Sequence, residues 1–144
     1  MRAFFALGLA SMITSCVGPA RTASNYKLKA RSSAKSGLSA VSTAQLAAKL
    51  VREKKTFATY VNVVLDSAES DITSVESTFS SIQPPHEDLD ALRDRVDNTL
   101  TDAGDAISSM RIAARRHAWD DLQHAAQDLP RLARELQRQS EAPA

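Results

Sequence analysis

The sequence contains one cysteine, four glycines and five prolines, and only 5% of its 144 residues are aromatic. A single cysteine cannot form an intramolecular disulfide, which excludes a small domain held together by disulfides. The scarcity of aromatic residues, glycine and proline argues against a β-sandwich or barrel. Alanine and leucine recur at helical spacings instead, and they favour one modest domain of packed helices.

Acidic residues are missing from the first 52 positions, which hold eight Lys or Arg. All seventeen Asp and Glu lie from Glu53 onward, together with ten Lys or Arg. The formal net charge of +1 therefore hides a basic N-terminal part and an acidic body. The basic part lacks the aromatic interleaving typical of nucleic-acid binders, so we expect no nucleic-acid partner.

The longest apolar run is short, covering about eleven residues from Ala3 to Ile13, whereas a membrane-spanning helix needs roughly twenty. Arg2 precedes this run, and small residues follow it. A positive start, an apolar core and a small-residue end are typical of a secretory signal. We therefore expect residues 1–15 to be a signal peptide.

The only cysteine directly follows this run, in the sequence Ile13-Thr14-Ser15-Cys16. This segment resembles the lipobox of bacterial lipoproteins, a branched apolar residue and two small residues before a cysteine, with Leu usual where Ile13 stands. The resemblance implies a diacylglyceryl group on Cys16, removal of residues 1–15, and attachment to the extracytoplasmic face of the cell membrane. Two acyl chains hold a protein on a bilayer durably. An ordinary signal peptide with a cysteine nearby by chance is the alternative.

Residues 16–37 combine basic residues with Ser, Ala and Gly and show no sustained apolar period. This composition predicts a lipidated, flexible, basic tether. Its positive charges would rest on anionic lipid headgroups or on acidic wall polymers, or they would only keep a solvated linker extended.

The rest of the chain is predicted to be all-α, an antiparallel three-helix bundle over residues 38–140. Neither Gly nor Pro occurs from Leu38 to Ile82, which predicts one long first helix that ends before Pro84-Pro85. Three apolar stripes of helical period, which begin at Phe57, Leu89 and Trp119, predict the core faces of the helices. The predicted helices cover residues 38–82, 86–116 and 118–139. Pro130 is expected to kink the third helix or to restart it, and residues 141–144 are predicted to be a disordered tail.

Two details of this bundle carry further expectations. Gly104 lies inside the second apolar stripe, where a close contact between helices would explain a glycine. Leu46 and Leu50 extend the first stripe upstream, beyond the reach of the two shorter helices. We therefore expect residues 38–55 to project as a partly uncovered stalk that binds an envelope protein or a second copy of the chain.

His117, Asp121 and His124 are the strongest candidates for metal ligands, because spacings of four and three place them on one helical face. The alternative is a solvated face whose acids pair with Arg115 or Arg116. No cysteine ligand remains, and the chain has neither a nucleophile motif nor a phosphate-binding glycine loop. We therefore expect no metal, no cofactor and no enzymatic activity.

A second resemblance extends over most of residues 40–138. Phe79 to Pro85, Leu92-Arg93 and Arg111 to Arg116 are similar to segments of small uncharacterised actinobacterial lipoproteins. The resemblance implies an extracytoplasmic helical domain on a lipid anchor, with no catalytic residues to transfer. Members of that family often have Gly where His117 stands, so a role for this histidine would be peculiar to this chain.

Together these features predict a lipid-anchored interaction or scaffold module of the cell envelope that performs no catalysis. The alternative is an extracytoplasmic sensor, or a lipoprotein that binds a ligand or a metal.

Overall fold

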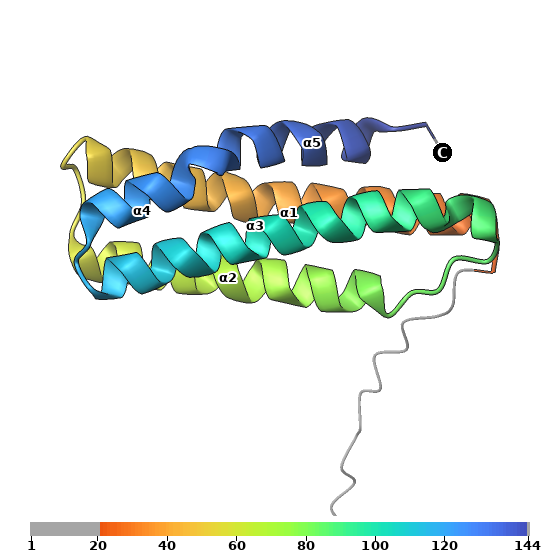
Figure 1. The fold of residues 1–144 in the computed structure, drawn as a ribbon, viewed down its shortest axis with the longest axis horizontal. Coiled ribbons are helices and arrows are strands. Elements are labelled where there is room, and N and C mark those ends of the chain that lie inside the picture. Colours follow the sequence, from red (N-terminus) through yellow and green to blue (C-terminus); the bar gives the residue numbers. More distant parts are fainter. Residues whose placement is uncertain (1–20, 144) are drawn as a thin grey trace, which may run out of the picture.

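The computed structural model describes residues 21–143 as helices joined by short connections (Figure 1). No strand occurs in this part of the chain, which confirms the predicted all-α class. The elements in chain order are α1 (Ala23–Arg52), α2 (Ala58–Ser80), the 3₁₀ turn η1 (Glu87–Leu89), α3 (Asp90–Arg115), α4 (Trp119–Ala125), the 3₁₀ turn η2 (Ala126–Asp128) and α5 (Leu129–Glu141).

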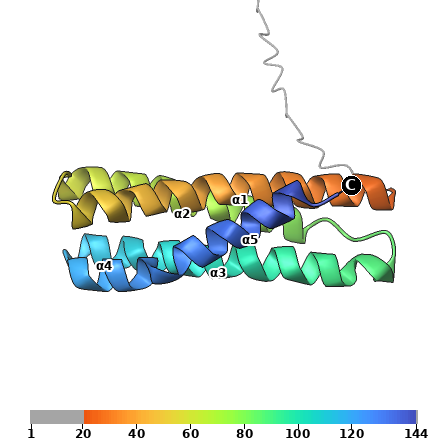
Figure 2. The ribbon, with the colours of Figure 1, turned by 90° about the horizontal axis from the view of Figure 1, so that it is seen from above.

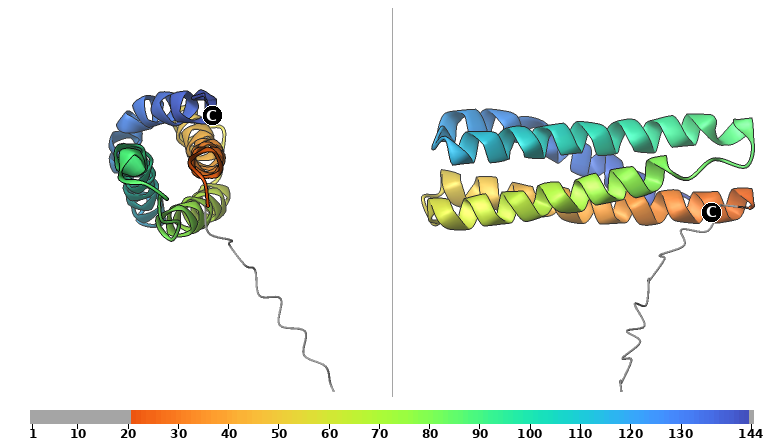
Figure 3. Two further views of the ribbon diagram at one scale, coloured as in Figure 1. Left: turned by 90° about the vertical axis from the view of Figure 1, so that its right-hand side faces the viewer. Right: turned by 90° about the horizontal axis from the view of Figure 1, so that it is seen from below.

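The helices form an elongated bundle around one core (Figures 1 and 3). α1 packs against α2, α3 and α5, and α2 also packs against α3. α4 and α5 follow one another along the remaining side, with α5 crossing obliquely (Figure 2). The α1–α2 and α3–α4 turns lie at one end, which we call the distal end, and residue 21 lies at the opposite end (Figure 1).

The prediction of one long helix over residues 38–82 is wrong. The predicted three-helix bundle depended on that helix and is therefore wrong too. α1 ends at Arg52, and α2 begins at Ala58 and returns alongside α1 (Figure 3). The residues of this turn include neither glycine nor proline. No helix-breaking residue therefore marked the end of α1.

The backbone of Lys54 shows how α1 ends. Its φ of 55° lies in the left-handed region. The N–H groups of Lys54 and Lys55 donate to the carbonyl oxygens of Val51 and Leu50, both at 3.0 Å. This is the Schellman arrangement, in which glycine usually occupies the left-handed position. Because lysine occupies this position, the sequence lacked the glycine that usually indicates the end of a helix.

Residues 23–37, predicted to belong to a flexible tether over 16–37, form the first half of α1. The side chain of Thr22 caps the helix by accepting a hydrogen bond from the Asn25 backbone N–H at 3.2 Å. Small side chains at helical intervals line the buried face, so the apolar stripe contains few of the large residues that usually reveal one. The buried residues of α1 are Tyr26, Ala30, Ala34, Gly37, Ala40, Val41, Ala44, Ala47 and Ala48.

Residues 38–55 do not form the expected stalk. α2 packs along α1, and α5 and α4 pack against it as well. Leu46 and Leu50, predicted to extend the core stripe, are exposed and half-buried respectively. The core residues of this segment are alanines and Val41 instead.

The later helices lie close to the predicted ranges. Residues 86–116 contain η1 and α3, and residues 118–139 contain α4, η2 and most of α5. The break falls at η2, and Pro130 occupies the first turn of α5, where its missing N–H costs no hydrogen bond. Glu141 belongs to α5 and not to a tail, and Ala144 lies outside the described residues.

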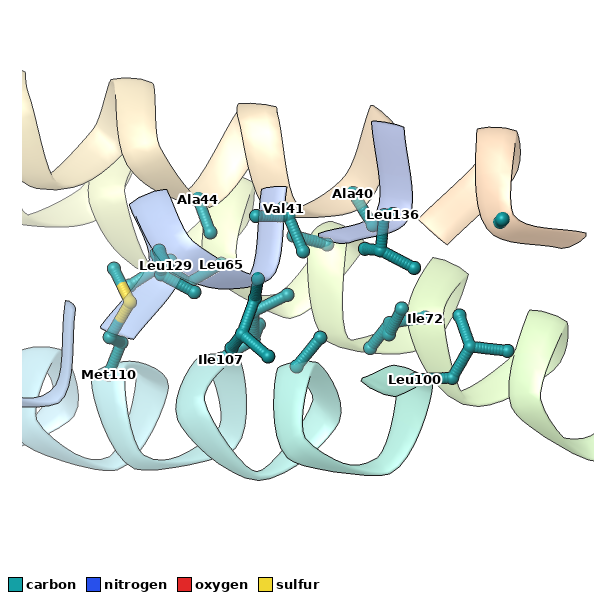
Figure 4. Close-up of a cluster of buried hydrophobic side chains, with 14 of the residues drawn as sticks. Ala40, Val41, Ala44, Leu65, Ile72, Leu100, Ile107, Met110, Leu129 and Leu136 are labelled. Carbon is teal, nitrogen blue, oxygen red and sulfur yellow. The ribbon is translucent and has the colours of Figure 1, made fainter. Parts of the chain in front are cut away.

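Large side chains from α2, α3 and α5 meet the small side chains of α1 in the core (Figure 4). Residues of all three predicted stripes are buried here. Phe57, predicted to begin the first stripe, is an exception and is exposed. The fully buried large side chains include Leu65, Ile72, Phe79, Leu100, Ile107, Met110, Leu122, Leu129 and Leu136.

An ion pair joins α2 to α3 beside this core. Arg111 Nη2 donates to Glu69 Oε1 at 3.2 Å, and Arg111 Nε contacts Oε2. Burial raises the pKa of Glu69, but hydrogen bonds with Ser108 and Arg111 oppose burial and leave the pKa below its usual value of 4.5. The folded state therefore favours the carboxylate.

The substitution Glu69→Gln should remove an acid-dependent part of the stability. A carboxyl whose pKa is depressed by folding stabilises the fold above pH 4.5 and ceases to do so as the pH falls through the folded value. We expect the variant to be about 1 kcal/mol less stable than the parent at neutral pH. Urea unfolding across pH should show the two proteins converging in acid, and a constant difference would contradict this role of Glu69.

Candidate functional site

Exposed apolar side chains collect where α2 begins, at the distal end of the bundle. Phe57 is 85% exposed, Val63 64% and Tyr60 50%. Tyr60 and Val63 are three residues apart and therefore lie on one side of the start of α2, and Phe57 directly precedes this helix. We call Phe57, Tyr60 and Val63 the distal patch.

The backbone at Phe57 explains its exposure. This residue directly precedes α2 and has an extended conformation, with φ −98° and ψ 148°. Its side chain therefore does not follow the helical face that buries Val61 and Leu65. The spacing that placed Phe57 in a core stripe assumed a helix that continues through the turn.

A cavity of about 530 Å³ lies between the end of α1, the start of α2 and the start of α4. Val51, Val61 and Trp119 are among its apolar walls. Arg52 and Lys54 also line it. Asp120 is the acidic residue of the lining. The distal end thus combines an exposed apolar patch with a cavity lined by apolar and charged side chains.

The second turn at this end repeats the geometry of the first. His117 has a φ of 55°, and the N–H groups of His117 and Ala118 donate to the carbonyl oxygens of Ala114 and Ala113 at 3.0 Å. A non-glycine residue in the left-handed region costs about 1 kcal/mol or more. The His117 ring lies edge-on to the ring of Trp119, with centroids 5.6 Å apart. The turn therefore places His117 against Trp119, which lines the cavity.

The predicted metal ligands do not share a helical face. His117 lies in the left-handed turn before α4, whereas Asp121 and His124 lie within α4. Asp121 and His124 line a separate groove of about 570 Å³ between α3 and the C-terminal helices. Among residues 21–143, no group of three His, Cys, Asp or Glu side chains is arranged to hold a metal ion.

The predicted lipidation site, Cys16, lies outside the described residues, as does the predicted signal peptide over residues 1–15. Lipid attachment and cleavage therefore stay predictions. Within residues 21–143, no helix combines the length and the apolar character that crossing a bilayer requires.

The sequence prediction missed the distal patch, although one signal for it was available. Tyr60 and Val63 are apolar but do not belong to the stripe that runs through Val61, Ala68 and Ile72. The charged run of residues 53–55 also interrupts the apolar pattern just before Phe57. Together they indicate a turn followed by a helix with a second apolar side.

Comparison of the chain with protein-family models, with curated proteins and with solved structures gave no match. The resemblance to actinobacterial lipoproteins stays a prediction that rests on Cys16 and on the quoted segments of residues 40–138.

Proposed function

We propose that this chain is a lipid-anchored extracytoplasmic protein that performs no catalysis and serves as an interaction or scaffold module of the cell envelope. The distal patch is the observation that carries the proposal. It lies at the opposite end of the bundle from residue 21 (Figure 1), and the predicted anchor at Cys16 precedes that residue closely in the sequence.

The length of α1 supports this arrangement. α1 contains 30 residues and is therefore about 45 Å long at a rise of 1.5 Å per residue. A protein anchored before the start of α1 carries its distal patch that far along the bundle from the anchored end. The patch would then be accessible to other proteins of the envelope.

The chemistry of the patch suits protein binding. Single exposed apolar residues are ordinary, but a group of them on one side of a helix marks an interaction surface. Phe and Tyr are enriched in protein interfaces. The partner segment predicted from the sequence, residues 38–55, ends two residues before Phe57. We place the contact at the patch instead, with a second copy of the chain as the simplest partner and another envelope protein as the other.

The anchor is tested by intact mass and membrane fractionation of the natively expressed protein beside Cys16→Ala. We expect loss of residues 1–15, an added diacylglyceryl mass, and release of the variant from the membrane. A soluble, unmodified parent protein would refute the anchored function.

The patch is tested by the double variant Phe57→Ser with Tyr60→Ser. Both side chains are exposed, so each change should alter the free energy of unfolding by no more than about 0.5 kcal/mol. In-cell crosslinking should lose the partner band in the double variant, whereas Ile112→Ser, which removes an exposed apolar side chain of α3, should retain it. An unchanged band in the double variant would contradict binding through the patch.

A ligand-binding role is the second candidate, and the cavity beside Trp119 favours it. The lining combines apolar walls with Arg52 and Lys54 against the single acidic residue Asp120, a balance that suits a small apolar anion. Trp119 is the only tryptophan, so its fluorescence reports on this cavity directly. Titration with decanoate should change its emission if this role is correct, and an unchanged emission would leave protein binding as the sole candidate.

A further inference from the structure

The charges of the bundle are separated by helix. α1 carries six Lys or Arg and no acidic residue. α2, which packs beside it, carries four Asp or Glu and no Lys or Arg. The later helices mix both signs. The two neighbouring helices thus give the bundle one basic side and one acidic side.

One strip of α1 faces away from the core along its whole length. Its positions recur at intervals of seven, seven, four and three, which places them on one side of the helix. All of them are exposed, and none is acidic. The residues of this basic strip are Leu28, Lys35, Ser42, Leu46 and Lys49.

The surface between α1 and the C-terminal helices continues the basic strip. A groove of about 340 Å³ between α1 and the α4–α5 region is lined by Lys49 and Arg52 among otherwise neutral side chains. Further along the same boundary, Arg31 Nε donates to the Ser140 carbonyl oxygen at 3.2 Å. This hydrogen bond holds a cation beside the strip.

We infer that the bundle lies on its side, with the basic strip of α1 against the anionic headgroups of the membrane. The inference rests on the proposed anchor at Cys16. Thr22, the cap of α1, follows Cys16 by six residues, and a chain of that length spans at most about 20 Å. The anchor therefore keeps the start of α1 close to the headgroups, and attraction of the basic side chains to anionic lipid brings the rest of the helix onto the surface.

Charge disfavours two other orientations of the bundle. In an upright bundle, the end at which α1 begins would meet the membrane. The start of α3 and the 3₁₀ turn before it lie at that end (Figure 1), and these segments include the exposed Glu87, Asp88 and Asp90. Contact through α2 would bring the exposed Asp66 and Asp71 to the same anionic surface. Both contacts place like charges together. The strip of α1 offers cations and two exposed leucines, a combination that suits the boundary between headgroups and acyl chains.

The distal patch remains free in this orientation, because it belongs to the start of α2. The membrane surface and the partner therefore meet different helices of the bundle. Lying on α1 fixes the direction in which Phe57 and Tyr60 are presented.

Site-specific labelling tests the orientation in the lipidated full chain. The predicted lipid occupies the thiol of Cys16, the only cysteine, so an introduced cysteine is the sole reactive thiol. Ser42→Cys places a fluorophore in the basic strip. Thr73→Cys is the control, since Thr73 is exposed on α2 in a groove that Asp66 and Glu69 also line. Both proteins are reconstituted into vesicles of phosphatidylcholine alone or with phosphatidylglycerol, and a quencher is attached to the lipid headgroups.

In the vesicles that contain phosphatidylglycerol, we expect the label at position 42 to be quenched at least about threefold more than the label at position 73. High salt should abolish the difference, because it screens attraction to the surface. Adding Lys35→Gln and Lys49→Gln to the Ser42→Cys protein should abolish it too. Both lysines are exposed, so the fold does not depend on them.

Equal quenching at positions 42 and 73 would overturn the proposed orientation. If position 42 were quenched more than position 73 to the same extent in neutral vesicles, the orientation would not have an electrostatic cause. If an added anionic wall polymer changed the fluorescence of the label at position 42 and anionic vesicles did not, the proposal that the basic strip contacts lipid would also be refuted. Failure of the anchor is distinguishable from these outcomes, because a chain without the diacylglyceryl mass would not sediment with the neutral vesicles at all.

Discussion

Replacing Tyr26 with alanine is expected to lower the free energy of unfolding by about 3–5 kcal/mol, the usual loss for truncating a buried aromatic side chain. Tyr26 lies near the start of α1 and is 0% exposed. Its ring is tilted against that of Phe79, with centroids 6.0 Å apart. Urea unfolding followed by circular dichroism measures the loss. A flexible tether would tolerate the change, so a loss below about 0.5 kcal/mol would contradict the packing of residues 23–37.

The variant Tyr26→Phe separates the ring from its hydroxyl. The Tyr26 hydroxyl is buried and makes no hydrogen bond to any described residue. Burial raises the pKa of Tyr26 above its usual 10.0, although Arg93 opposes the shift. The folded state therefore favours the neutral hydroxyl, whose contribution is complete below pH 10 and is lost as the pH rises further. Tyr26→Phe should match or exceed the parent at neutral pH and should lack this alkaline loss.

The C-terminal half of the fold could be predicted because large side chains reveal its periodicity. Leu92, Val96, Leu100 and Ile107 recur at helical spacing, and consecutive prolines end the preceding helix. Both signals act locally. A helix that buries leucine and isoleucine is stabilised by burial whichever helix covers it, so its existence does not depend on knowing its neighbours.

α1 could not be predicted in the same way, because its buried face consists mainly of alanine. A small side chain removes little apolar area from water, so an alanine stripe gives a weak signal in the sequence. Its benefit lies in letting helices approach closely, and that depends on which side chains the neighbours supply. The turn at Lys54 was difficult to predict for a different reason: its left-handed backbone geometry usually signals itself by a glycine, and a lysine occupies the position in this chain.

The Cys16 motif and the distal patch also differ in whether the local sequence suffices to predict them. The Cys16 motif is a local pattern, and the sequence alone suffices to propose it. The distal patch depends on which side of α2 its neighbours cover, so Tyr60 and Val63 could not be told from core residues by their type. The separation of charge was visible in the sequence, but its meaning required the helix that arranges Lys35 and Lys49 on one exposed strip.

Gly37 is expected to tolerate larger side chains poorly. A Cβ atom built on Gly37 would lie 2.5 Å from Leu100 Cδ2, 3.4 Å from Ile72 Cδ1 and 3.5 Å from Leu136 Cδ2. These three side chains belong to α3, α2 and α5 and are fully buried. None of them can move without disturbing the core, because protein interiors are close-packed.

Gly37→Val should therefore destabilise the protein by about 2–3 kcal/mol, the usual cost of overpacking a core. Such a loss lowers Tm by about 10 °C in a protein of this size. Gly37→Ala gains about 1 kcal/mol of helix propensity, and the clash with Leu100 opposes that gain. We expect Gly37→Ala to give no net stabilisation in thermal and urea unfolding.

Gly104 supplies the matched control on α3. The sequence predicted a close helix contact there, but a Cβ atom would lie 3.6 Å from Glu76 Oε2 and 3.9 Å from Ile72 Cγ2, which is ordinary van der Waals contact. Gly104→Ala should accordingly stabilise the protein by about 0.5–1 kcal/mol through helix propensity. The same substitution is then favourable on α3 and unfavourable or neutral on α1. If Gly37→Ala stabilised the protein as much as Gly104→Ala, α1 would not approach its three neighbours as closely as the structure shows.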